Sequence, residues 1–235
     1  DGTYARYGLD VKIQQGGPQI NARLLLAAGR VDFAIGGNTI EMFEAVRQNV
    51  PILSVASMFQ LDPVVFVSHP GAGLDRFEDL PKATVFLASE FRASIWQWLK
   101  QTYGFKDSQV KPYGFNVAPF LADKSSVQQG LLTSEPYAIE QKGGFKPNVF
   151  LLADEGYDGY STTIDARADM VAKNPDLVQR FVDASIIGWY HYIYGDNAAA
   201  NAAIKHDNPE MTDGQLAFSL AKLKESGVVD SGDSL

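Results

Sequence analysis

Apolar and polar residues alternate along several short segments of this chain, while other segments carry apolar residues three or four positions apart. The first pattern is typical of half-buried strands and the second of amphipathic helices. In the first third of the chain we expect strands at residues 9–14, 31–35, 52–56 and 62–68. Helices are expected at residues 20–28 and 39–50, with these side chains in the core: Leu24, Leu25, Ala28, Met42, Phe43 and Val46.

The same plan repeats further along the chain. Strands are expected at residues 84–88, 126–132, 148–153 and 159–167, with a mostly extended stretch at residues 109–117. Ser89 is the expected N-cap of a helix that ends at Gly104 and buries Ile95, Trp96, Leu99 and Tyr103. Further helices are expected at residues 120–123, 135–141, 196–206 and 212–226, and from Pro175 after the N-cap Asn174.

Strands that alternate with helices indicate an α/β protein with mixed, mainly parallel sheets. The sequence His69-Pro-Gly-Ala-Gly73 follows a strand and is a candidate hinge, and residues 159–167 form a candidate return strand. We therefore predict two α/β domains with a ligand cleft between them. Domain I comprises residues 1–67 plus 162–235, and domain II comprises residues 68–161.

Composition narrows the function. The 235 residues carry 20 Lys and Arg against 28 Asp and Glu, a net charge of −8 that disfavours binding to nucleic acid. The absence of cysteine excludes disulfides, thiolate catalysis and cysteine-ligated metals. The three histidines have no zinc-site spacing, and neither a P-loop nor a Gly-x-Ser-x-Gly motif occurs. We expect no catalytic residue, no metal and no cofactor.

Glycine pairs follow the first two expected strands, where a helix should begin. Bare backbone N–H groups at that position can face a ligand at the carboxyl edge of a sheet. The candidate ligand contacts here are Gly17, Gly37, Asn38 and Thr39. In the alternative interpretation, Gly17 belongs to a plain tight turn and the Asn38 side chain is fully occupied as a helix cap.

The second predicted domain offers candidate partners for two kinds of ligand. Ser89 and Arg92, at an expected helix start, suit an anion, and Phe91 lies between them. Glu135 at another helix start suits an amino group. The alternatives are that Arg92 is an ordinary solvated charge and that Glu135 stabilises its own helix dipole.

Aromatic side chains near these turns could stack on a flat heterocycle. They are Phe59, Phe91, Tyr113 and Phe115, of which Phe59 and Phe91 are the candidate ligand contacts, and Asn116 is a polar candidate beside them. Core packing is the alternative role for each ring.

Four motifs in order resemble a known family. They are Tyr7-Gly-Leu-Asp-Val11, Gly29-x-Val-Asp-Phe-Ala-x-Gly36, Ser134-Glu-Pro-Tyr137, and a helix with Pro175, Val178, Phe181, Ala184 and Gly188. Together they are similar to the solute-binding proteins of ABC importers, in the branch that binds thiamine-pyrimidine precursors, sulfonates, taurine and nitrate. The resemblance implies a type II periplasmic-binding-protein fold, a periplasmic or otherwise extracytoplasmic location, a monomer, and an ABC permease as membrane partner. Members usually have a strand before residues 2–11 and a helix beyond residue 235, so we expect both to be missing here.

Several ligand and function classes stay open. A thiamine-pyrimidine-like aminoheterocycle suits Glu135 with the aromatic rings, whereas a sulfonate, taurine or another small anion suits Ser89 and Arg92. Fungal pyrimidine synthases share the scaffold, but their cysteine-rich motif is not present in these residues. The ligand-sensing domain of a transcription regulator is a further alternative.

Overall fold

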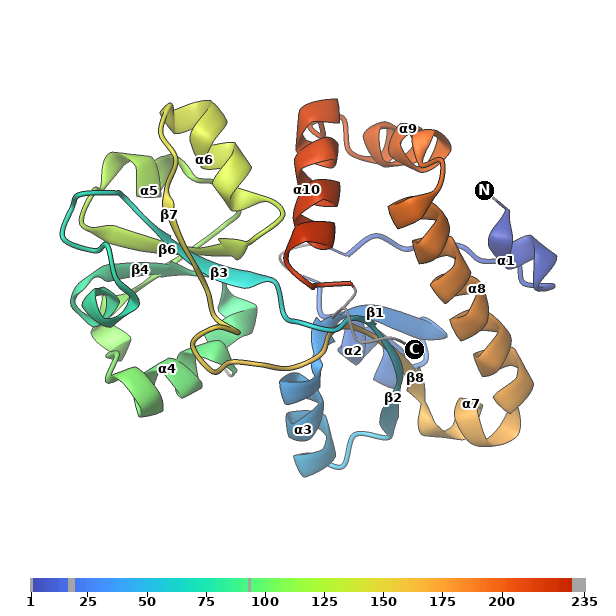
Figure 1. Cartoon of the computed structure of the whole chain (residues 1–235). Coiled ribbons are helices and arrows are strands. Elements are labelled where there is room, and N and C mark those ends of the chain that lie inside the picture. The colour runs from blue at the N-terminus through green and yellow to red at the C-terminus, as the bar shows by residue number, and fades with distance from the viewer. Residues whose placement is uncertain (1, 17–19, 93, 230–235) are drawn as a thin grey trace.

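The computed structural model describes residues 2–16, 20–92 and 94–229, which form two lobes, each built around a sheet (Figure 1). The sheet of the first lobe has the strand order β1 (Phe33–Asn38), β8 (Ser161–Arg167), β2 (Ile52–Phe59). The sheet of the second lobe has the order β5 (Val110–Pro112), β4 (Thr84–Leu87), β6 (Ser126–Leu131), β3 (Val64–Ser68), β7 (Asn148–Leu151).

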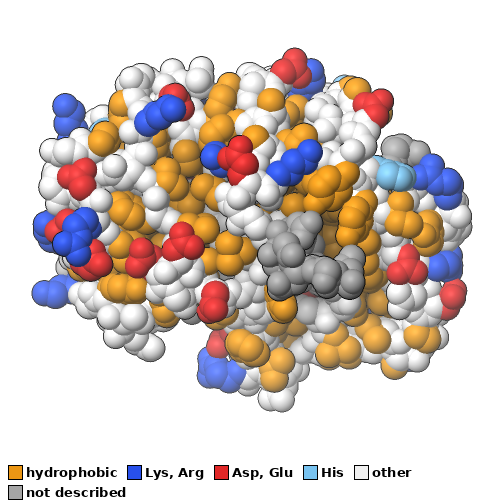
Figure 2. All heavy atoms as spheres, viewed as in Figure 1, with side chains coloured by type: hydrophobic (Ala, Val, Ile, Leu, Met, Phe, Trp, Pro, Cys, Tyr) orange, Lys and Arg blue, Asp and Glu red, His pale blue; other side chains and the backbone are white. Residues whose placement is uncertain are grey.

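Helices cover both sheets. The first lobe carries α1 (Thr3–Arg6), α2 (Ala22–Ala27), α3 (Thr39–Arg47), α7 (Ala168–Lys173), α8 (Pro175–Tyr194), α9 (Ala198–Asp207) and α10 (Asp213–Glu225). The second lobe carries α4 (Ile95–Tyr103), α5 (Ala118–Ala122) and α6 (Glu135–Gly143), with 3-10 turns at Phe77–Lys82, Ser89–Arg92 and Asp107–Gln109. On the face in Figure 2, acidic and basic side chains are interspersed over both lobes rather than gathered into one patch.

The predicted α/β class with mixed sheets is confirmed, although antiparallel pairing is more common than expected. β4 pairs in parallel with β5 and β6. The other described pairs are antiparallel: β8 with β1 and with β2, and β3 with β6 and with β7.

The chain passes between the sheets twice. We name residues 60–63, between β2 and β3, the first crossover, and residues 152–160, between β7 and β8, the second crossover. β3, which the sequence analysis placed in domain I, pairs with β6 and β7 of the second lobe. All five of its residues are buried, as expected for an apolar strand with neighbours on both sides. The division of the chain into two domains remains a prediction, and these pairs favour boundaries at the crossovers.

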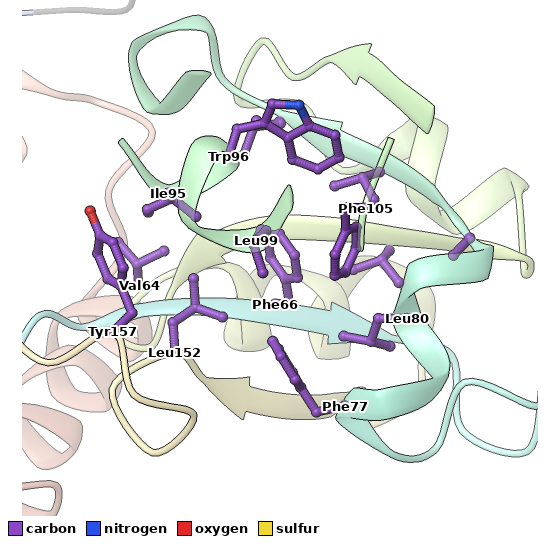
Figure 3. Packing of buried hydrophobic residues seen from close by; sticks show 14 of the residues in the cluster. Val64, Phe66, Phe77, Leu80, Ile95, Trp96, Leu99, Phe105, Leu152 and Tyr157 are labelled. Carbon is purple, nitrogen blue, oxygen red and sulfur yellow. The ribbon is translucent and has the colours of Figure 1, made fainter. Parts of the chain in front are cut away.

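The core of the second lobe is well specified by the sequence. Ile95, Trp96 and Leu99 of α4 are at most 1% exposed, as the helical spacing predicts. They pack with Phe66 of β3 and Phe105 (Figure 3). Burying such large aromatic and aliphatic side chains is the main stabilising contribution to the lobe.

The expected strand at residues 9–14 does not form. No described strand pairs with this segment, and alternation produces a strand only where a neighbour supplies the hydrogen bonds. Its alternation has another origin, since Leu9 and Val11 pack against a cluster that includes Phe181, whereas Ile13 is 83% exposed.

The helices of the first lobe bury fewer side chains than expected. In α2 the fully buried residue is Leu26, and Leu24 is 66% exposed. In α3, Met42 is buried while Phe43 and Val46 are 70% and 65% exposed. Helical spacing predicts which residues share a face, but tertiary packing decides which face meets the sheet.

Gln128 is expected to destabilise the second lobe. It lies in β6 with no exposed area, and within the described chain neither its amide nitrogen nor its amide oxygen has a hydrogen-bond partner. A buried, unpaired polar group costs about 1–3 kcal/mol. Gln128→Met keeps the side-chain length and should raise the free energy of unfolding in urea by about that amount. A loss of stability would contradict this and indicate that the amide binds a buried water.

Candidate functional site

Strand ends bring most of the predicted residues to two sheet edges. In the first lobe β1 and β2 both run against β8, so their carboxyl ends meet at one edge. In the second lobe β4, β5 and β6 are parallel, so the turns that follow them share one edge. Both crossovers join these two edges. The first runs from the end of β2 to Pro63, whose O accepts from Leu132 N at 2.8 Å beside the end of β6. The second runs from the end of β7, beside the start of β3, to Ser161, which pairs with Asn38 and Phe59. The two edges therefore lie on either side of the crossovers.

The turn at residues 36–39 is the best-defined part of the first edge. Asn38 is the N-cap of α3, as predicted: its Oδ1 accepts from Glu41 N at 3.0 Å. Its Nδ2 donates to Asp62 Oδ2 at 2.9 Å and lies 3.5 Å from the hydroxyl of Tyr157. Asn38 is 2% exposed, and both atoms of its side-chain amide bond to other residues of the chain. This matches the alternative interpretation, in which Asn38 serves as a helix cap rather than a ligand contact.

Arg23 is a residue of this edge that the sequence analysis missed. Its guanidinium pairs with Glu41 and with Asp165, the latter at 2.7 Å, and donates to Asn38 O at 3.2 Å. The Glu41 side chain therefore pairs with Arg23, while its backbone N–H donates to Asn38 Oδ1. A Cβ at Gly37 would lie 2.6 Å from the Glu41 carboxylate and 2.7 Å from the Arg23 guanidinium, and φ there is +65°. The position therefore requires glycine.

Thr39 completes the turn. Its backbone N–H donates to Tyr160 O at 3.0 Å, and its side chain lines a hollow of 360 Å³. The hollow has both polar and apolar surface and is lined by Thr39, Ser54, Val55, Ala56, Ser57, Gln60, Tyr160 and Thr163. A second hollow of 300 Å³ lies beside α8 and contains none of the predicted ligand residues. Gly17 lies outside the described residues.

The turn after β4 differs from its prediction. Ser89–Arg92 forms a 3-10 turn, and α4 begins only at Ile95 after Ser94, so Ser89 is not the N-cap of that helix. Ser89 and Arg92 are exposed at the second edge. Phe91 is half-buried and packs against both hydrophobic clusters of the lobe, which leaves part of one aromatic surface accessible.

Glu135 follows the turn after β6, and its side chain bonds back to the end of that strand. Its carboxylate accepts from the Tyr113 hydroxyl at 2.8 Å and from Leu131 N at 2.7 Å, and the residue is 6% exposed. Burial raises the pKa of the Glu135 carboxyl, although both hydrogen bonds act in the opposite direction. The same burial raises the pKa of Tyr113 far above its ordinary value. Glu135 is thus a buried structural carboxylate in this structure, and an amine contact would have to compete with Tyr113.

The remaining candidates lie apart from one another. Asn116 is exposed near Phe115, and its Oδ1 accepts from Ala118 N at 3.0 Å. Phe59 ends β2 but packs edge-on against Trp189, with the ring centroids 5.5 Å apart. Five predicted residues therefore lie at the second edge: Ser89, Phe91, Arg92, Asn116 and Glu135. Three lie at the first edge: Gly37, Asn38 and Thr39. Phe59 packs beneath α8 instead.

The two lobes also touch through α10. Thr133 O, in the turn before α6, accepts from Gln215 Nε2 at 2.8 Å and from Ser219 Oγ at 2.7 Å. Tyr137 of α6 packs on Phe218 of α10, with the ring centroids 5.4 Å apart. This side of the second edge is consequently covered by a helix of the first lobe (Figure 1).

Within the described chain, no group of three His, Cys, Asp or Glu side chains is placed to hold a metal ion. Among the same residues, no helix has the length and apolar content needed to cross a bilayer.

Asp62 is expected to make the fold more stable as the pH falls. Burial raises the pKa of this carboxyl to about 6, whereas an unfolded aspartate has a pKa of about 3.9. The folded chain therefore takes up the proton first, and the contribution of Asp62 to stability rises between about pH 7 and pH 4 by up to about 3 kcal/mol. Urea unfolding should show a larger gain on acidification for the wild type than for Asp62→Asn. Equal gains would contradict this assignment.

Two lobes, two crossovers and strand-end turns at the edges that the crossovers join are the architecture of the two-lobed periplasmic-binding-protein fold. The chain belongs to the NMT1/THI5-like family, whose model matches residues 1–199. It is 27% identical over 187 residues to a curated protein described as riboflavin-binding protein RibY, from Chloroflexus aurantiacus. That match covers 77% of this chain but 52% of the relative, so the chain spans about half the length of that protein.

Solved structures support the same fold. A protein from Bordetella bronchiseptica has a TM-score of 0.66 at 17% identity, covering 96% of this chain and 74% of that one. The alkanesulfonate-binding protein SsuA from Xanthomonas axonopodis pv. citri, bound to MOPS, has a TM-score of 0.56 at 15% identity, covering 88% of this chain and 70% of that one. At these identities the likeness shows the fold alone.

Proposed function

We propose that this protein is the extracytoplasmic solute-binding component of an ABC importer, which captures a small organic solute by closing its two lobes. The observation that carries the proposal is the pair of sheet edges joined by two crossovers, within a family that includes such proteins. A hinge of this kind converts ligand contact into a change of shape that a membrane permease can recognise. Release to an ABC permease and action as a monomer are parts of the same proposal.

A flat heterocycle is the ligand class we favour. Phe115 is 49% exposed, and its ring centroid lies 5.3 Å from that of Tyr113 at the second edge. An exposed ring supported by a second ring is a suitable stacking surface for an aminopyrimidine or another planar heterocycle. The relative RibY is described as binding riboflavin, which is also a planar heterocycle. Because Glu135 is engaged by Tyr113, stacking rather than amine recognition supports this choice.

A small anion such as taurine or another sulfonate is the second candidate. The observation that favours it is Arg92, exposed in the turn after β4 together with Ser89. A guanidinium there can bind a sulfonate through two parallel hydrogen bonds.

Thermal unfolding with riboflavin, an aminopyrimidine, taurine, an alkanesulfonate and nitrate should separate these classes. A ligand at 100 times its dissociation constant adds about 2.7 kcal/mol, which corresponds to a rise of about 5–10 °C in Tm for a chain of this size. We expect Phe115→Ala to abolish the shift from a heterocycle and Arg92→Ala to abolish the shift from a sulfonate. If a heterocycle shifts Phe115→Ala as much as the wild type, the stacking assignment is wrong.

A further inference from the structure

Three buried polar side chains meet where the two lobes join. Asp62 belongs to the first crossover, Tyr157 to the second, and Asn38 to the turn at the end of β1. Asn38 Nδ2 donates to Asp62 Oδ2 at 2.9 Å and lies 3.5 Å from the Tyr157 hydroxyl. The three residues are 2–3% exposed, so water does not readily replace these contacts.

Asn38 and Asp62 each carry a second bond that fixes their orientation. Asn38 Oδ1 caps α3 through Glu41 N at 3.0 Å, and Asp62 Oδ1 accepts from Val64 N, at the start of β3, at 3.1 Å. The Asn38–Asp62 bond therefore links the first turn of α3 in the first lobe to the first strand residue of the second lobe.

Tyr157 extends this link into the core of the second lobe. Its ring packs against Trp98 of α4 with a centroid separation of 5.1 Å. It belongs to the same hydrophobic cluster as Ile95, Val64 and Leu152, beside which it lies in Figure 3. Ile40 of α3 also packs on this cluster. One side chain thus contacts the N-cap of a helix in the first lobe and a helix of the second.

We propose that Asn38, Asp62 and Tyr157 form a positioning device that sets the angle between the two lobes and couples the turn at residues 36–39 to both crossovers. A solute that contacts this turn would act on the hinge through Asn38. That last step rests on the proposed function, but the setting of the lobe angle does not.

Other charged groups surround the device. Burial is the main cause that raises the pKa of the Asp62 carboxyl, and the charge of Glu41 on α3 raises it further. Glu41 is itself paired with Arg23, which also binds Asp165. Tyr157 interacts with the charges of Asp62 and Glu41, and burial is the main cause that raises its pKa to about 12. A measurement at about pH 8 keeps the Asp62 carboxylate ionised and Tyr157 neutral.

An exchange of the two partners tests the proposal. In Asp62→Asn the two amide nitrogens face each other, because each oxygen is held by a backbone N–H, so the bond is lost. In Asn38→Asp two carboxylates face each other. The double variant Asn38→Asp with Asp62→Asn restores a donor opposite an acceptor, and aspartate is an equally good N-cap.

The readout is the distance between the lobes in the absence of any solute. The chain has no cysteine, so Arg47→Cys on α3 and Gln101→Cys on α4 give one exposed site for a spin label in each lobe. Double electron–electron resonance then measures the distance between the two labels. We expect Asp62→Asn to shift or broaden the distance distribution and the double variant to restore it. Asp75→Asn is the matched control, because Asp75 Oδ1 likewise accepts from a backbone N–H, of Gly71, and from Asn148 Nδ2, but lies away from the crossovers.

A change in Tm with an unchanged distance distribution in Asp62→Asn would overturn the proposal and leave α10 as the contact that fixes the lobes. Failure of the double variant to restore the distribution would also overturn it. If Asp62→Asn fails to fold, Tyr157→Phe serves instead, since it keeps the packing on Trp98 and removes only the hydroxyl. Because no solute is added, these outcomes are independent of whether the protein binds a heterocycle, an anion or neither.

Discussion

Phe66→Ala should lower the free energy of unfolding by about 3–5 kcal/mol, a large part of the 5–15 kcal/mol that stabilises a typical protein. Phe66 has no exposed area and lies in β3, which is paired on both sides. Its ring meets Phe105 edge-on at 6.3 Å. Removing it leaves a cavity that the paired strands cannot close, and urea unfolding followed by circular dichroism measures the loss.

Phe43→Ala is the matched control for this prediction. Phe43 is 70% exposed on α3, so its truncation should change stability by no more than about 0.5 kcal/mol. If Phe43→Ala is as costly as Phe66→Ala, then Phe43 is buried against a surface that the structure does not show, and the first-lobe packing described above is wrong.

The second large effect is expected at Gly130 of β6. A Cβ there would lie 2.6 Å from both Cβ and Cγ of Glu135, which is closer than non-bonded carbon atoms approach in folded proteins. Gly130→Ala should therefore cost about 1–3 kcal/mol and displace Glu135 from Tyr113 and Leu131 N. Thermal unfolding measures the cost. Gly114→Ala is the control, because Gly114 is exposed and its Cβ would meet no atom within 4 Å. Equal Tm values for the two variants would contradict the close packing of Glu135 over Gly130.

Local sequence patterns predicted well what depends on neighbouring residues. The Asn38 cap and the buried face of α4 follow from spacings of three or four residues, and the turn after β6 follows from Ser134-Glu-Pro-Tyr137 after an expected strand. Patterns failed where distant segments decide the outcome. β3 was placed in domain I, yet it pairs with β6 and β7, because its apolar run specifies burial but not its neighbours.

The candidate site shows the same limit. Asp62, Tyr157 and Arg23 meet Asn38 from three separate segments, so no sequence motif marks them. Glu135 was chosen for its place in Ser134-Glu-Pro-Tyr137, but the motif could not reveal that Tyr113 donates to its carboxylate. Ligand chemistry depends on which polar atoms remain available after folding, and that follows only from tertiary contacts.

Small-angle X-ray scattering with and without riboflavin, an aminopyrimidine, taurine, an alkanesulfonate or nitrate tests the central claim most directly. A protein that captures a solute by lobe closure becomes more compact when the solute binds. We predict that at least one of these solutes, at saturating concentration, reduces the radius of gyration, and that the ligand-free protein returns to the larger value after dialysis. A radius of gyration that stays the same with all five, or with one that raises Tm, would contradict capture by lobe closure.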